Sequence, residues 1–166
     1  MAITEPILRE MDQEAAATRR LLERVPEEQL KWRPHPKSDS LGQLALHVAQ
    51  IPGAVSAITT LDVFEAPSFQ DRREAVSRRQ LLETFEEGLA AARKIVSGMD
   101  AAKLAEPWTL QRNGQVVFTS PRGDIVRTIL LNHYYHHRGQ LSVYLRMLDV
   151  PLPSIYGPSA DENPFT

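Results

Sequence analysis

Histidines are the residues best suited to chemistry in this chain, and three of the five lie within residues 132–140. His133 and His137 are four residues apart in a segment with helical periodicity. Residues at this spacing share one helix face, with Cβ atoms about 6 Å apart, so both imidazoles can bind one metal ion. His136 lies about 100° around the helix from His137 and cannot share this geometry equally. Two histidines do not complete a metal site, so a third ligand must come from elsewhere.

His47 is the candidate third ligand, because it lies in the middle of an apolar stripe on another predicted helix. Burying three imidazoles costs free energy unless their nitrogens have partners, and a metal ion supplies a partner to all three. Three neutral nitrogens also leave an open coordination position, as in catalytic zinc sites. The alternatives are hydrogen-bonded core histidines and a metal-free bundle with a histidine-rich core. Asp161 and Glu162 are the next candidate ligands if His47 does not bind the metal.

Three further side chains lie near the candidate ligands in the sequence and are candidate catalytic residues. His136 and Tyr135 could assist proton transfer, with packing roles as the alternative. Gln140 lies about one turn after His137 and could hydrogen-bond a ligand or a substrate.

Hydrophobic periodicity predicts four amphipathic helices, and four such helices favour an all-α four-helix bundle. The predicted helices cover residues 4 to about 24, 41 to about 60, 77 to about 96, and 120 to about 148. Asn113-Gly114, between two short β-type segments, is typical of a two-residue turn and predicts a small β-hairpin before the last helix. Between Leu61 and Val76 no pattern is visible.

The faces of the predicted helices suggest where the site and a partner would lie. Small residues near His47 leave space for a pocket; they are Ala45, Ala49, Gly53 and Ala54. On the last helix, the side opposite the histidines is partly apolar, and we expect it to be a partner surface or to be covered by the hairpin. Its residues are Leu131, Tyr134, Arg138 and Leu145.

Length and composition indicate one globular domain, residues 1–166, that is 42% hydrophobic and 24% charged. The net charge of −2 argues against a nucleic-acid partner. The chain has no cysteine, so a catalytic thiol would have to come from another molecule. The N-terminal residues do not form a signal peptide, and no apolar run approaches the ~18 residues of a membrane span. We therefore expect a cytoplasmic protein without a membrane partner.

Four sequence segments resemble the DinB-like metal-binding four-helix bundles, from about residue 32 to the C-terminus. They are Trp32-x-Pro34, Ser40-Leu41-Gly42-x-Leu44-x-x-His47, Asn132-His133-x-x-His136-His137-Arg138-Gly139-Gln140 and Pro151-x-Pro153-Ser154-x-Tyr156-Gly157. The resemblance implies an up-down-down-up bundle in which His47, His133 and His137 bind a divalent metal ion, often zinc or nickel. Characterised relatives include transferases and an isomerase that use low-molecular-weight thiols such as bacillithiol or mycothiol.

The leading hypothesis is a metal-dependent enzyme of the thiol S-transferase or related hydrolase type. A divalent ion held by three histidines lowers the pKa of a bound water or thiol and holds the anion ready to attack. The expected partners are a small-molecule substrate, such as a low-molecular-weight thiol, and a second copy of the chain in a homodimer. The alternative is a non-catalytic metal-binding protein that acts in a stress response or as an interaction module. An accessible pocket at the metal favours the enzyme, whereas a closed site favours the alternative.

Overall fold

The computed structural model describes residues 2–67 and 72–165 as a helical protein with one small three-stranded sheet. In chain order, its elements are α1 (Glu5–Leu22), the 3₁₀ turn η1 (Glu27–Gln29), α2 (Leu41–Ile58), β1 (Val63–Glu65), α3 (Arg78–Ser97), α4 (Ala101–Ala105), β2 (Pro107–Arg112), β3 (Gln115–Pro121), α5 (Arg122–Ile125), the π-helix η2 (Val126–Asn132) and α6 (His133–Met147).

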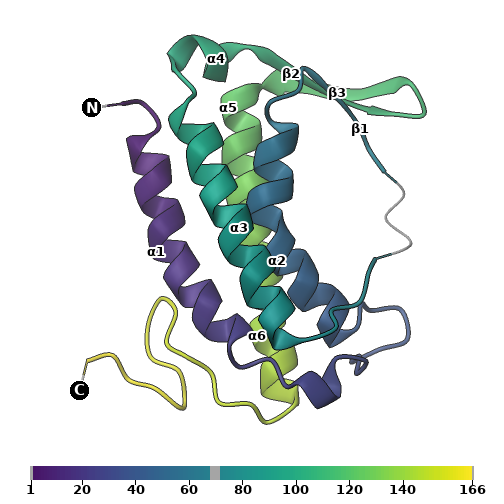
Figure 1. Ribbon diagram of the computed structural model, residues 1–166, viewed down its shortest axis with the longest axis vertical. Helices are drawn as coiled ribbons and strands as arrows, with labels where there is room; N and C mark the ends of the chain where they lie inside the picture. Colours follow the sequence, from purple (N-terminus) through teal and green to yellow (C-terminus); the bar gives the residue numbers. More distant parts are fainter. Residues whose placement is uncertain (1, 68–71, 166) are drawn as a thin grey trace.

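The long helices lie side by side, and the sheet crosses one end of them together with α4 (Figure 1). α2 and α3 run towards the sheet, whereas α1 and the continuous segment from α5 to α6 run away from it (Figure 1). α2 contacts α3 as well as η2 and α6. This central position makes α2 the helix that connects the core to the last helix.

Local sequence signals explain where α2 and α3 begin. The Ser40 side chain accepts a hydrogen bond from the Gln43 amide, and the Gln43 side chain accepts one from the Ser40 amide. This reciprocal pair satisfies two amide groups that the first turn of a helix leaves free. At the start of α3 the Ser77 side chain accepts a hydrogen bond from the Gln80 amide, and the Gln80 side chain accepts one from the Val76 amide. The observed helix ends lie within about two residues of the predicted ones, as is usual for frayed ends.

The predicted hairpin is confirmed, but it belongs to a larger sheet. β2 and β3 pair antiparallel around Asn113 and Gly114, whose φ angles are 54° and 72°. Positive φ at both turn positions matches the right-handed twist of a hairpin and explains the Asn-Gly dipeptide. β1 adds a third strand, parallel to β2, in the segment where no pattern was visible. Its three residues are too few for an alternating pattern to be recognised.

The last helix departs from the prediction in two ways. It is not one regular α-helix, because the seven residues Val126–Asn132 form a π-helix. The prediction of a partner surface on its far side is also wrong, because the residues of that side are all buried; they are Leu131, Tyr134, Arg138 and Leu145. A constant 100° per residue does not hold through a π-helical segment, and this helix is covered on more than one side.

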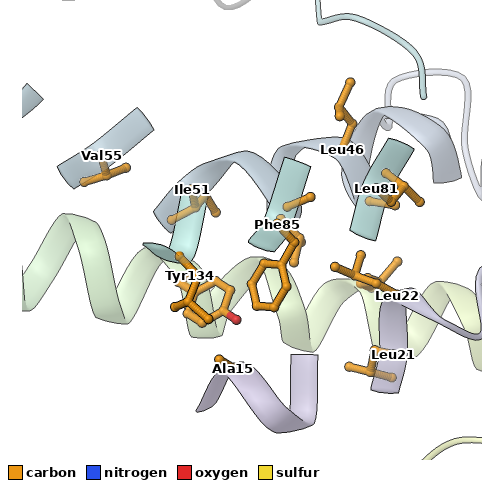
Figure 2. Close-up of a cluster of buried hydrophobic side chains, with 14 of the residues drawn as sticks. Ala15, Leu21, Leu22, Leu46, Ile51, Val55, Leu81, Phe85 and Tyr134 are labelled. Atoms are coloured by element: carbon orange, nitrogen blue, oxygen red, sulfur yellow. The ribbon is translucent and has the colours of Figure 1, made fainter. Parts of the chain in front are cut away.

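The core lies between the long helices, and Figure 2 shows side chains from each of them pointing inward. Phe85 of α3 and Tyr134 stack in its centre, with ring centroids 6.4 Å apart. α2 is apolar enough to meet a simple criterion for a membrane span, with mean hydropathy 1.3 over 18 residues. However, 61% of that segment is buried inside the protein, which is the environment of a core helix.

α2 and α3 are in close backbone contact at two glycines, Gly53 and Gly88. A Cβ atom added at Gly53 would lie 2.8 Å from the Gly88 Cα, and one added at Gly88 would lie 3.0 Å from the Gly53 amide nitrogen. Ala45 and Ala49, earlier on α2, are fully buried. Of the small residues expected to leave room for a pocket near His47, these three therefore serve core packing.

We predict that Gly53→Ala destabilises the protein, because the new methyl group meets backbone that cannot rotate away. Overpacking of this kind costs about 1–3 kcal/mol, which outweighs the better helix propensity of alanine. Gly139→Ala is the matched control, since a Cβ at this helical position meets no atom within 4 Å. It should raise the free energy of unfolding by up to ~1 kcal/mol. Denaturant unfolding of both variants measures the difference, and equal stabilities would contradict the prediction.

Candidate metal centre

The structure brings His47, His133 and His137 together between α2 and α6, although 86 residues separate the first two. Nε2 of His133 lies 3.4 Å from Nε2 of His47 and 2.8 Å from Nε2 of His137. One ring nitrogen from each of the three residues lies within 4.8 Å of the other two. Nitrogen ligands of a tetrahedral zinc ion, each ~2.0–2.1 Å from the metal, lie about 3.3 Å apart. The two observed separations, 2.8 Å and 3.4 Å, lie on either side of this value.

The three rings cannot satisfy one another by hydrogen bonding when all are neutral. An imidazole nitrogen carries either one proton or one lone pair, so Nε2 of His133 can make only one of its two contacts a hydrogen bond. Its Nδ1 is buried and makes no hydrogen bond of ordinary geometry among the described residues, although the Ile129 carbonyl is close enough to influence its pKa. A cation accepts a lone pair from each ring and removes this conflict. The donor set therefore fits a divalent metal ion.

Gln140 orients one of the three rings. Its Oε1 lies 2.7 Å from Nδ1 of His137, so the imidazole donates a proton there and keeps the lone pair on Nε2. Hydrogen bonds of this kind fix the tautomer of metal-binding histidines. Gln140 thus lies where it can position a ligand.

The other two candidate catalytic residues occupy different surroundings. His136 is exposed, and its ring meets the ring of His137 in an edge-on arrangement, with ring centroids 4.9 Å apart. Tyr135 is half-buried, and its hydroxyl donates to Glu10 of α1. That hydrogen bond and burial raise the pKa of Tyr135, burial being the larger cause. The structure therefore brings His136 to the edge of the histidine cluster and directs Tyr135 towards α1.

Burial lowers the pKa of all three clustered histidines, and the positive charge of Arg72 adds to the effect. The pKa of His47 falls to about 3 and that of His137 to about 4. The pKa of His133 is lowered as well, although the Ile129 carbonyl acts in the opposite direction. Neutral imidazoles are the form that binds metal ions, so the surroundings favour the ligand state at neutral pH.

Two cavities open at the histidines. One, of about 270 Å³, is polar and lies between Gln43, His47, Gln50, Arg72 and Arg73. The other, of about 340 Å³, lies under the sheet; His47 and His133 line it, but its remaining lining residues are apolar. Hydrophobic periodicity did not predict that arginines or sheet residues belong to the site, because they approach the histidines only through the tertiary fold.

Asp161 and Glu162, the next candidate ligands after His47, form ion pairs with arginines instead. Asp161 pairs with Arg146, and Glu162 pairs with Arg20. These ion pairs, with Arg138 against Tyr156, hold the C-terminal segment against α1 and α6. The structure therefore offers His47, not the tail, as the third ligand.

The fold and the histidine cluster define a helical protein with a candidate metal centre, and comparisons with known proteins give its family. The DinB family model matches residues 1–164, so the chain belongs to the DinB family. An uncharacterised Bacillus subtilis protein, YrdA, is 28% identical over 159 residues, which cover 93% of this chain and 89% of that protein.

Solved structures of DinB-like proteins have the same fold. A Bacillus cereus protein has a TM-score of 0.71 at 21% identity, covering 92% of this chain and 97% of its own. The YjoA protein of Bacillus subtilis has a TM-score of 0.69 at 17% identity, with coverages of 91% and 98%. A DinB family member from Exiguobacterium sibiricum has a TM-score of 0.63 at 20% identity, with coverages of 93% and 97%. The resemblance noted in the sequence is confirmed.

The lowered pKa values predict that acid destabilises the metal-free protein. A histidine in an unfolded chain titrates near 6.5, whereas His47 titrates at about 3 in the fold. Between these values the unfolded chain binds more protons, so the free energy of unfolding decreases as pH falls below about 6.5. Denaturant unfolding with a chelator, at a series of pH values, measures this dependence.

His47→Gln isolates the contribution of one ring, because glutamine does not titrate. This variant should lose less stability than the wild type between pH ~6.5 and ~5.5, a range in which most carboxyl groups are still ionised. His35 is exposed, so His35→Gln should keep the wild-type dependence. A wild-type stability that rises as pH falls through this range would contradict the sign.

Proposed function

We propose that this protein is a metal-dependent enzyme of the thiol S-transferase or related hydrolase type. Nitrogen atoms from three imidazoles converge, and only a cation could accept a lone pair from each of them. This observation carries the proposal. His47, His133 and His137 would hold the ion, with zinc or nickel as the expected metals. Such an ion, when bound, lowers the pKa of a coordinated water or thiol.

The polar cavity supports a thiol co-substrate. The chain has no cysteine, so the sulfur nucleophile must come from another molecule. Arg72 and Arg73 line this cavity, and Arg72 pairs with Asp39. Arg73 makes no ion pair among the described residues, and its positive charge suits a carboxylate group of a small anionic thiol. In the transfer, the sulfur forms a bond to an electrophilic carbon, the bond from that carbon to its leaving group breaks, and the thiol proton passes to solvent.

The accessible cavities favour an enzyme over a closed metal site in a non-catalytic stress-response or interaction protein. His47 borders both cavities, so small molecules can reach the cluster from two sides. We further propose that the long helices form the up-down-down-up bundle, supported by their directions in Figure 1. A homodimer and a cytoplasmic location remain predictions from the sequence.

We predict that the protein purified without chelator carries about one divalent ion per chain. His47→Ala, His133→Ala and His137→Ala should each lose most of it, because two histidines do not complete a site. His136→Ala is the matched control and should keep the metal, since this exposed ring lies on the same helix outside the cluster. Elemental analysis of the four variants measures the metal content. Full metal in both His133→Ala and His137→Ala would refute the site.

We predict that Arg73→Gln weakens the use of an anionic thiol. With glutathione as the thiol and 1-chloro-2,4-dinitrobenzene as the electrophile, its KM for glutathione should rise about two- to fivefold, the equivalent of ~0.5–1 kcal/mol for an exposed ion pair. The KM for 2-mercaptoethanol, which is neutral, should stay unchanged and serves as the control. No turnover of either thiol by the metal-loaded protein would argue against this transferase reaction.

A further inference from the structure

The apolar cavity of about 340 Å³ lies where three parts of the chain meet. Val55 and Ile58 line it from the C-terminal half of α2, Trp108 and Phe118 from the sheet, and Ile129 from η2. His47 and His133 are also part of the wall. Two of the three metal-ligand candidates therefore face an otherwise apolar space.

Buried polar contacts hold the walls of this cavity in place. The Trp108 indole donates a hydrogen bond to the carbonyl of Ile58, the last residue of α2. The fully buried Arg122 donates to the carbonyls of Thr59 and Leu61 just beyond that end. Phe64 and Phe118 flank Trp108, with ring centroids 6.2 and 6.0 Å away. The sheet is thus fixed to α2, and the space between them is preformed.

The lining determines what can bind. No described lining residue carries a charge at neutral pH. The polar groups on the lining side chains are the imidazoles of the two histidines and the Trp108 indole N–H, which is already hydrogen-bonded to the Ile58 carbonyl. An ionic group would lose its hydration there without gaining a partner, whereas an apolar group gains free energy from burial. The volume suits a small molecule: an engineered cavity of ~150 Å³ binds benzene, so this one has room for a substituted aromatic ring. It is too small for a helix of a protein partner.

We propose that this cavity binds the apolar body of the electrophilic substrate, as a neutral aromatic or branched alkyl group. The proposal rests on the proposed function and deepens it, because a molecule seated there would lie against His47 and His133, which line the cavity. The anionic thiol would approach from the polar cavity, which His47 also lines. The two substrates then meet at the histidines from opposite chemical environments, and each cavity excludes the other substrate by its polarity.

Binding to the cavity can be tested without metal or turnover, with toluene as the probe. The chain has two tryptophans, so Trp32→Phe leaves Trp108, in the cavity wall, as the only indole fluorophore. Toluene should change the Trp108 fluorescence saturably, with and without a chelator. N-methylacetamide, a polar solute, should give no saturable change.

Two variants of α2 provide the matched comparison. Ala54 lines the cavity, whereas Ala57 does not, and both are exposed, so a larger side chain is compatible with folding at each. Ala54→Phe should weaken toluene binding at least tenfold, and Ala57→Phe should change it by less than twofold. Equal toluene affinity in the two variants, or no saturable response in the folded Trp32→Phe protein, would overturn the proposal. Because the measurement works with a chelator present, its result is independent of whether the histidines bind metal.

Discussion

The close approach of α2 and α3 at Gly53 and Gly88 is the contact on which the site depends. It places the two backbones against each other and fixes α2 in the middle of the helices. Another face of α2 carries His47 to within 3.4 Å of His133. Side chains in close-packed interiors have little room to move, so a shift of α2 away from α3 would be transmitted to the histidine cluster. Two residues without side chains thus contribute to the position of a candidate ligand on another face of α2.

The histidines lie at a boundary between two environments. On one side are arginines and glutamines, and on the other a nearly uniform apolar wall. Burial keeps the imidazoles neutral, and the positive charge of Arg72 adds to this effect, although Arg72 makes no described hydrogen bond to them. The same surroundings would weaken the binding of protons and leave lone pairs available to a metal ion. A cation held there would be the link between a polar and an apolar reactant.

Local patterns in the sequence predicted what depends on neighbouring residues. The spacing of His133 and His137, the apolar stripe around His47 and the Asn113-Gly114 turn each describe one element, and the structure has all three. Features that need tertiary contacts were missed. β1 is short and pairs with a distant strand, Arg72 approaches the histidines through a long connection, and the buried side of α6 depends on which helices cover it. The π-helix was missed because hydrophobic periodicity assumes an α-helix.

The π-helical segment Val126–Asn132 makes the length of the last helix as important as its composition. Its i→i+5 hydrogen bonds accommodate a wider turn than those of an α-helix. If the same residues wound as a regular α-helix, each would turn by about 100°, and the part of the helix that carries His133 and His137 would be rotated relative to the part that begins at Arg122. Deleting one residue from this segment removes the extra residue that the wider turn holds, so an unbroken α-helix could keep both parts facing much as they do now. Loops elsewhere in the chain can gain or lose residues at little cost, whereas here an inserted residue would turn the candidate ligands away from the cavity while leaving every side chain of the site present.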